Sequence, residues 1–109
     1  MPAKSLTCLL LGTALAAAIP TAPAQAQEAA EAALAEARRA ADSGQSAEAI
    51  APYREALRQA GQERPDWRLE LADQLTWAGE LNAAVDEYRR VIASGRDDLM
   101  TKAQTGLGR

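Results

Sequence analysis

Residues 67–92 read WRLELADQLTWAGELNAAVDEYRRVI, and this stretch decides the fold. Apolar residues in its first half recur every three or four positions, a spacing that places them on one side of a helix. The second half repeats that spacing from Ala84 to Ile92. Gly79 separates the halves and favours a helix end, because glycine adopts a positive φ at little cost. The stretch therefore predicts two antiparallel helices joined by a tight turn.

Composition limits what the chain can build and bind. Its 109 residues include few aromatic side chains and no phenylalanine, so we expect one small domain with a thin core of small side chains. The net charge is −3. Because acidic and basic residues are interspersed, neither nucleic acid nor an anionic membrane surface is expected as the main partner.

The N-terminal 26 residues have the pattern of a secretory signal peptide. Lys4 is followed by an apolar run over residues 6–19, and small residues then end at Ala24-Gln25-Ala26. The apolar run is too short for a permanent membrane span. We expect cleavage after Ala26, with Ala24 as the alternative site, and therefore a periplasmic or secreted protein.

A second pair of helices is predicted before the opening stretch. Residues 27–43 are almost all strong helix formers, and Gly44 is expected to end this helix. Residues 47–60 form the next predicted helix. Short polar side chains accept backbone N–H bonds at helix starts. The expected N-caps are Ser46, Asp66, Asn82 and, for a further helix, Asp97 or Asp98.

The two predicted pairs are copies of one sequence pattern. Stripe and turn positions match at an offset of 35 residues, which chance alignment would not preserve. A third copy is expected to begin near residue 99, with Leu107-Gly108 aligned to Leu71-Ala72 at an offset of 36, and to be cut short at Arg109. The matched positions include Ala37 with Ala72, Gly44 with Gly79, Ala49 with Ala84, and Tyr53 with Tyr88.

This pattern resembles the tetratricopeptide repeat. Leu71-Ala72, Gly79, Ala84-Val85 and Tyr88 stand at the spacings of that family's motif. The resemblance implies an all-α fold of tandem helical hairpins, stacked as a right-handed α-solenoid whose concave face binds peptides or other proteins. It divides residues 27–98 into repeats at about 30–63 and 65–98, and makes residues 99–109 the start of a third repeat.

The resemblance also indicates which residues face the concave groove. They are Leu34 and Arg38 in the first repeat, and Leu69, Asp73 and Trp77 in the second. Trp77 lies outside the apolar stripe, so it either offers a stacking platform to a ligand or packs on the neighbouring repeat. The Asn and Lys residues with which chaperone-binding members clamp a C-terminal carboxylate are absent from these positions, which disfavours that function.

Residue types needed for common catalytic chemistry are missing. The chain has no histidine, its single cysteine, Cys8, lies in the expected signal peptide, and no Ser or Thr lies beside a plausible base. Asp97-Asp98 are better explained as acids at a helix start than as metal ligands. We therefore expect no enzyme activity, no cofactor and no metal site.

Three functions stay open on the sequence alone. The first is a periplasmic scaffold whose groove holds other exported proteins or peptides. The second is the N-terminal arm of a larger outer-membrane assembly, because LxLADxLTWAG at 69–79 resembles the repeats that precede exopolysaccharide-export barrels, as in cellulose-synthase-type systems. The third is a repeat appendage of a periplasmic enzyme. Two repeats are few for a stable array, so self-association is a further option.

Overall fold

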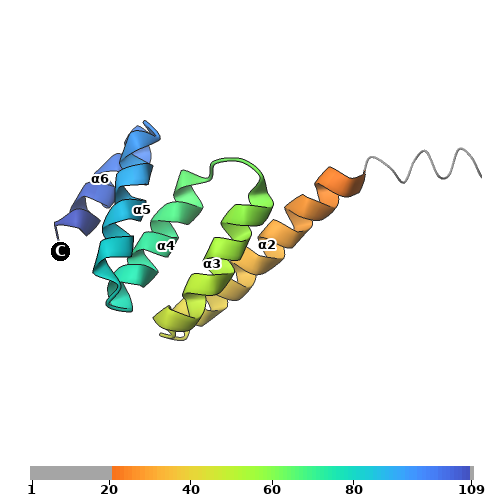
Figure 1. Ribbon diagram of the computed structural model, residues 1–109, viewed down its shortest axis with the longest axis horizontal. Helices are drawn as coiled ribbons and strands as arrows, with labels where there is room; N and C mark the ends of the chain where they lie inside the picture. The colour runs from red at the N-terminus through yellow and green to blue at the C-terminus, as the bar shows by residue number, and fades with distance from the viewer. Residues whose placement is uncertain (1–20, 109) are drawn as a thin grey trace, which may run out of the picture.

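The computed structural model describes residues 21–108, with side chains from residue 24 onward, and this part of the chain is entirely helical with no strand. The predicted all-α class is confirmed for these residues. The helices, labelled as in Figure 1, are α2 (Thr21–Asp42), α3 (Ser46–Ala60), α4 (Pro65–Trp77), α5 (Leu81–Ala93) and α6 (Asp97–Leu107).

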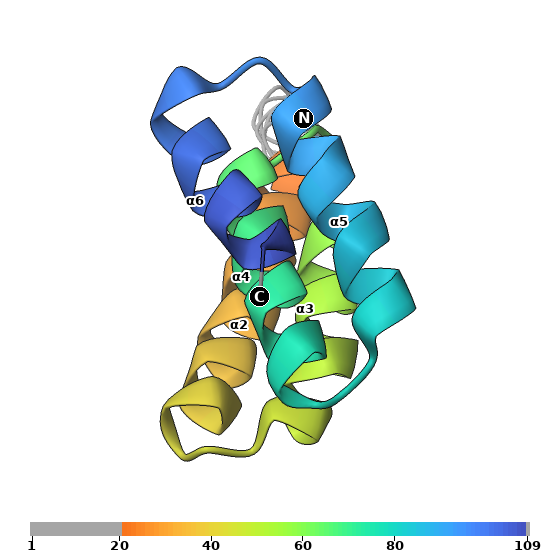
Figure 2. The same cartoon turned by 90° about the vertical axis from the view of Figure 1, so that its left-hand side faces the viewer.

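Successive helices pack against one another from α2 to α6, and α4 also contacts α6. The connecting loops lie at alternate ends of the helices, so each helix runs back along the one before it (Figure 1). The view along the stack has α5 and α6 nearest the viewer, with α2 and α3 behind them (Figure 2). This arrangement of helix pairs is consistent with a helical repeat.

The two hairpin turns, at Gly44 and Gly79, have the same backbone structure. Their φ angles are 77° and 86°, in the left-handed region that glycine adopts readily. After the second turn the Glu80 N–H donates to the Leu75 carbonyl at 2.8 Å, and the residue after Gly44 makes the corresponding bond at 2.9 Å. These bonds satisfy carbonyls at the helix ends and reverse the chain within two residues.

The predicted N-caps are wrong at all four helix starts. No side chain makes a capping hydrogen bond at the positions before α3, α4, α5 and α6. At the two hairpins the backbone turn is complete one residue after the glycine, so the next helix begins at Ser46 itself in the first pair and one residue before Asn82 in the second. Pro65 starts α4 in the same way, because a proline fits the first helical position. The residues expected as caps, Ser46, Asp66, Asn82, Asp97 and Asp98, all lie in a first helical turn.

The first helix starts earlier than predicted. It begins at Thr21 rather than Gln27, and it accommodates Pro23 because backbone N–H groups of a first turn have no helical partner. The predicted cleavage point after Ala26 lies within α2, whereas residues 1–20 of the predicted signal peptide lie outside the described residues. Of the helices described, none combines the length and apolar character needed to cross a membrane.

The core is a continuous layer of small and medium apolar side chains. Each pair buries its tyrosine, Tyr53 at 2% and Tyr88 at 1% exposure, together with the alanines expected at the helix contacts. No polar or charged residue from 24 to 108 is fully buried. The largest fully buried side chains are Tyr53, Tyr88, Leu71, Leu75 and Val91.

The predicted register of the third copy is wrong. Leu107 is 36% exposed, whereas Leu71-Ala72, its expected counterpart, is fully buried. Gly106 is the buried glycine of α6. The number of residues between corresponding positions decreases along the chain instead of increasing. The reason is that α5 is shorter than α3, and the loop after α5 is shorter than the loop after α3. As a result α6 starts at Asp97, 32 residues after Pro65.

Candidate functional site

A groove runs between α2 and α4. It consists of two hollows of about 300 Å³ and about 400 Å³, which both include Ala41 and Gln74 in their walls and therefore adjoin. We call this surface the α2–α4 groove. Helix α2 contributes Arg38, Ala41 and Asp42 to it, and α4 contributes Glu70, Asp73, Gln74 and Trp77.

Helical spacing explains why α4 turns these side chains to the groove. Glu70, Asp73, Gln74 and Trp77 stand at i, i+3, i+4 and i+7, so they form a stripe along one side of the helix. The apolar residues of α4, including Leu71, are buried on its other sides. The packing of α4 into the core therefore fixes the direction in which the polar stripe points.

Glu70 ties three helices together at one end of the groove. Its carboxylate accepts two hydrogen bonds from the Arg38 guanidinium of α2, at 2.9 and 2.6 Å, and one from the Tyr53 hydroxyl of α3, at 2.9 Å. The hydrogen bonds with Glu70 raise the pKa of Arg38 above its usual value. Burial, together with the bond to Glu70, raises the pKa of Tyr53. Both tyrosine and arginine therefore keep their protons across the physiological range.

Asp73 takes part in a second network near the middle of the groove. The Tyr88 hydroxyl of α5 donates a hydrogen bond to the Asp73 carboxylate. Thr76 Oγ1 lies 3.4 Å from that hydroxyl and donates to the Ala72 carbonyl at 2.9 Å. The tyrosines of both helix pairs thus reach acids of α4 that are one turn apart.

The structure brings three of the five predicted groove residues to this surface. Arg38, Asp73 and Trp77 line it, and Trp77 is 69% exposed. Leu34 and Leu69 are instead buried, at 6% and 7% exposure, because they belong to the apolar stripes of their helices. Both side chains therefore offer almost no surface to a ligand.

Sequence reasoning missed Glu70, Gln74 and Asp42. The spacing that finds all three is present in the sequence, since Glu70 and Gln74 flank Asp73 on one helical face and Asp42 stands four residues after Arg38. Helical spacing could not predict the contact between α2 and α4, because Arg38 and Glu70 are 32 residues apart in the chain.

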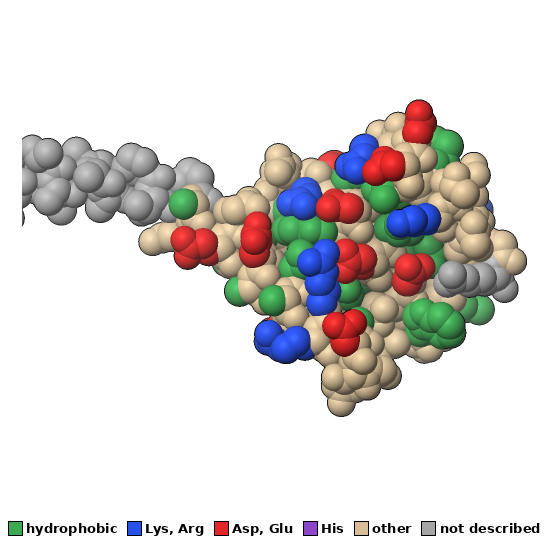
Figure 3. Space-filling view, turned by 180° about the vertical axis from the view of Figure 1, so that it is seen from behind, with side chains coloured by type: hydrophobic (Ala, Val, Ile, Leu, Met, Phe, Trp, Pro, Cys, Tyr) green, Lys and Arg blue, Asp and Glu red, His purple; other side chains and the backbone are tan. Residues whose placement is uncertain are grey.

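Among the described side chains that line the smaller hollow, three are acidic, those of Asp42, Glu70 and Asp73, and one is basic, that of Arg38. Glu70 and Asp73 both accept the hydrogen bonds described above. The side-chain oxygen Oε1 of Gln74 is buried, and no described residue donates a hydrogen bond to it. On the reverse of the view in Figure 1, acidic and basic side chains lie close together with small hydrophobic areas among them (Figure 3).

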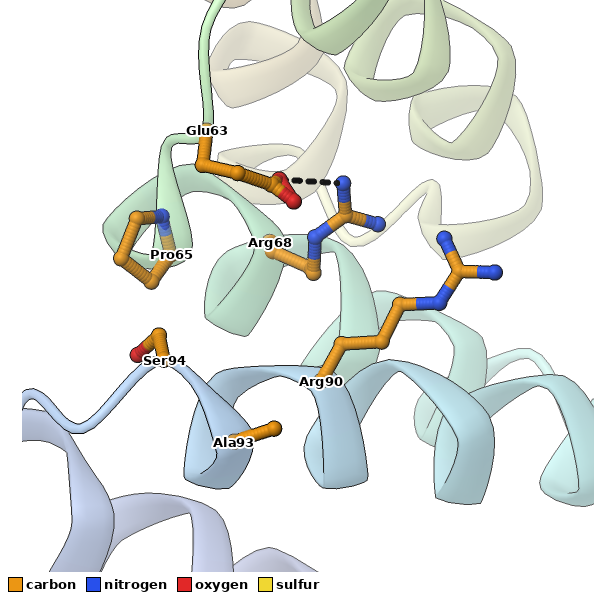
Figure 4. Close-up of a pocket in the computed structure, with 6 residues that line it drawn as sticks. All are labelled: Glu63, Pro65, Arg68, Arg90, Ala93 and Ser94. Carbon is orange, nitrogen blue, oxygen red and sulfur yellow. Dashed lines mark hydrogen bonds and ion pairs between the residues drawn. The ribbon is translucent and has the colours of Figure 1, made fainter.

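A further hollow of about 420 Å³ lies at the other end of α4, between the start of α4 and the end of α5 (Figure 4). Arg68 dominates it and pairs with Glu63 at 3.3 Å and with Glu87 at 2.6 Å. Burial acts to lower the pKa of Arg68, but the hydrogen bonds that it donates to these carboxylates, together with their charge, raise it overall. With its charge compensated twice, Arg68 ties the α3–α4 loop, α4 and α5 together, and this hollow is a weaker candidate for binding.

No family model, no curated protein and no solved structure matches this chain. From residue 24 to 108, no three His, Cys, Asp or Glu side chains converge as metal ligands would. The expected absence of catalysis and of a cofactor stays a prediction, and the function has to be argued from the groove.

Proposed function

We propose that this chain is a non-catalytic, tetratricopeptide-type scaffold of the periplasm that binds other exported proteins or peptides in the α2–α4 groove. In this proposal the helix pairs stack as a right-handed α-solenoid and the groove is its concave side. Closely similar turns at Gly44 and Gly79, and nearly complete burial of both Tyr53 and Tyr88, support the repeat.

One observation carries the choice of binding surface. Helix α4 buries its apolar side chains in the core but lines a groove of two adjoining hollows with a polar stripe that ends in an exposed tryptophan. An exposed tryptophan beside ordered polar groups is typical of surfaces that bind a partner. In the hollow at Arg68, the guanidinium group already forms ion pairs with Glu63 and Glu87.

Site-specific photocrosslinking in cells tests the proposal. A photoreactive amino acid at Ala41, in the groove, is expected to give a discrete adduct with another protein, identified by mass spectrometry of the periplasmic fraction. The same amino acid at Asp86, an exposed position of α5 outside every hollow described here, is the matched control and is expected to give none. Equal adducts at both positions, or none at Ala41, would contradict the proposal.

Export is tested separately. We propose that residues 1–26 direct export and are then removed. N-terminal sequencing of the chain recovered from the periplasm is expected to begin at Gln27. Recovery of the intact chain from the cytoplasm alone would contradict the periplasmic location while leaving the groove available for a partner there.

A further inference from the structure

We infer that export leaves a glutamine as the first residue of the mature chain, and that this glutamine closes into an N-terminal pyroglutamate lactam. The inference rests on the proposed removal of the signal peptide and names a covalent modification that follows from it. Both predicted cleavage points lead to the same residue type, because cleavage after Ala26 exposes Gln27 and cleavage after Ala24 exposes Gln25. The modification therefore does not depend on which of the two bonds is cut.

The start of α2 makes the new terminus accessible. Every side chain from residue 24 to residue 29 is exposed, and Ala30, at 0% exposure, is the first buried residue of the described part of the chain. The start of α2 projects beyond the end of α3 (Figure 1). Cleavage therefore removes no described core contact, and opening an exposed helix end costs little free energy.

Lactam formation needs only the glutamine itself. The neutral α-amine nitrogen attacks the side-chain carbonyl carbon Cδ, so that an N–Cδ bond forms and the Cδ–Nε2 bond breaks. Nε2 leaves as ammonia with the proton that the amine gives up, and the step requires no oxidant, reductant or co-reactant. An α-amino group has an ordinary pKa of about 8, so an appreciable fraction is neutral and reactive at physiological pH.

Helix α2 favours the lactam over the free amine. A protonated amine at a helix start is opposed by the positive end of the helix dipole, whereas the lactam carries no charge. Glu28 and Glu31 are acidic and therefore suit this end of the helix. Nε2 of Gln27 donates to Glu31 at 3.2 Å, and an exposed bond between helix neighbours of this kind is weak enough to open before the ring closes.

The ring also protects the start of α2. Residues 27–29 lie outside the core and are exposed, so they are open to aminopeptidases, which act on a free α-amine. A lactam has no free α-amine. Ring closure therefore gives the mature chain an N-terminus that aminopeptidases do not shorten.

Mass spectrometry of the chain recovered from the periplasm tests this inference. The N-terminal peptide is expected to begin at Gln27 or Gln25 and to be lighter than its sequence by one molecule of ammonia. The matched control carries both Gln25→Asn and Gln27→Asn, because an N-terminal asparagine would have to close a strained four-membered ring on its own amine. This variant is expected to keep a free α-amine, which an amine-reactive label detects, and to be shortened by an aminopeptidase that leaves the parent chain intact.

Two results would overturn the inference, and they separate it from the proposed function. A chain that begins at Gln27 or Gln25 but keeps a free α-amine, even after long incubation at physiological pH and temperature, shows that the ring does not form while the proposed export stands. A chain that begins at any other residue, or that keeps residues 1–26, contradicts the proposed cleavage and the lactam together. The scaffold function is judged independently by the crosslinked adduct at Ala41.

Discussion

The two helix pairs, α2–α3 and α4–α5, have nearly the same internal structure but different outer surroundings. Both turn at a glycine with positive φ, and both bury a tyrosine almost completely. The isoleucine of the first pair, Ile50, is 7% exposed, whereas its counterpart Val85 is only partly buried. The pairs differ because α4 and α5 follow the first pair, while α6 alone follows the second.

Exposed apolar side chains show the same difference. In the described part of the chain, the large hydrophobic side chains that are exposed are Trp77, Leu81 and Leu107, all from the second pair or α6. A hollow of about 180 Å³ beside Tyr88 is lined by Leu81 and Leu107. A helix pair therefore buries its own internal contacts, whereas its outer side is buried only by the helices that follow it.

Removal of a core leucine gives the largest expected effect. Leu75→Ala should lower the free energy of unfolding by about 2–5 kcal/mol, because Leu75 is fully buried in the core and its truncation leaves a cavity. Leu107→Ala, at the partly covered end, should cost less than about 1 kcal/mol. Urea denaturation followed by circular dichroism at 222 nm measures both. Equal losses would mean that the side chain of Leu107 is as well packed as that of Leu75.

Gly106 tests the contact between α6 and the second pair. A Cβ at this position would lie 2.3 Å from Cζ of Tyr88, far inside contact distance. Gly106→Ala should therefore destabilise the chain by about 1–3 kcal/mol by overpacking, even though alanine is the better helix former by about 1 kcal/mol. Gly108→Ala is the matched control, since a Cβ there meets nothing closer than 3.5 Å. A stabilising effect of both substitutions would show that Tyr88 moves aside freely.

The turns and buried tyrosines within each helix pair could be predicted from the sequence, but the way in which successive elements pack against one another could not. Gly44, Gly79, Tyr53 and Tyr88 could be placed from the sequence because turn chemistry and apolar spacing are local properties that recur at one offset. The register of α6 could not, since the lengths of α5 and of the following loop are set by packing and are not written in a motif.

The candidate site likewise has one part that the sequence predicts and another part that it does not. The α4 stripe from Glu70 to Trp77 is a local pattern and could have been predicted in full from its spacing. The bonds that Arg38 and Tyr53 make to Glu70 join three helices, and no spacing rule connects them. The prediction that Leu34 faces the groove was wrong because Leu34 is buried, and burial depends on where the neighbouring helices lie.

Alkaline pH is expected to lower the stability of the interface between the two helix pairs, where Tyr53 bonds Glu70. An unfolded tyrosine has a pKa of about 10, whereas burial and the bond to Glu70 raise the pKa of Tyr53 in the folded chain. Above pH of about 10 the unfolded chain releases this proton and the folded chain keeps it. Stability should therefore fall by up to about 1.4 kcal/mol per pH unit from this group alone.

Tyr53→Phe identifies the contribution of that hydroxyl. At neutral pH the variant should be less stable by about 1 kcal/mol, the usual value of one hydrogen bond. Its loss of stability between pH 9.5 and 11 should be smaller than that of the unmodified chain by a similar amount, about 1 kcal/mol. Thermal unfolding across that pH range measures both. Identical pH profiles would show that the bond to Glu70 does not govern alkaline unfolding.

The smallest expected effect compares the starts of α4 and α6. Arg64 donates to Asp66 at 3.3 and 3.1 Å and stacks 3.9 Å above the Trp67 ring. Arg96 and Asp98 form the same kind of pair, at 3.0 and 2.7 Å, but they are more exposed, and no aromatic ring among residues 24–108 stacks on Arg96. The ion pair of Arg64 with Asp66 should therefore contribute more to stability than that of Arg96 with Asp98, because solvent screens it less.

Acid titration separates these two ion pairs. Burial acts to raise the pKa of Asp66, but the hydrogen bonds and charge of Arg64 outweigh it and lower the pKa below its usual value. Stability from this pair is present above the unfolded pKa, about 3.9, and is lost as the pH falls through the folded value. Asp66→Asn should cost a few tenths of a kcal/mol, about 0.5 at most after solvent screening, at pH 7 and nothing near pH 2.5. Asp98→Asn should leave the unfolding midpoint unchanged at both pH values. If the two substitutions behave alike, the stacking of Arg64 on Trp67 adds nothing, and the starts of α4 and α6 are equivalent.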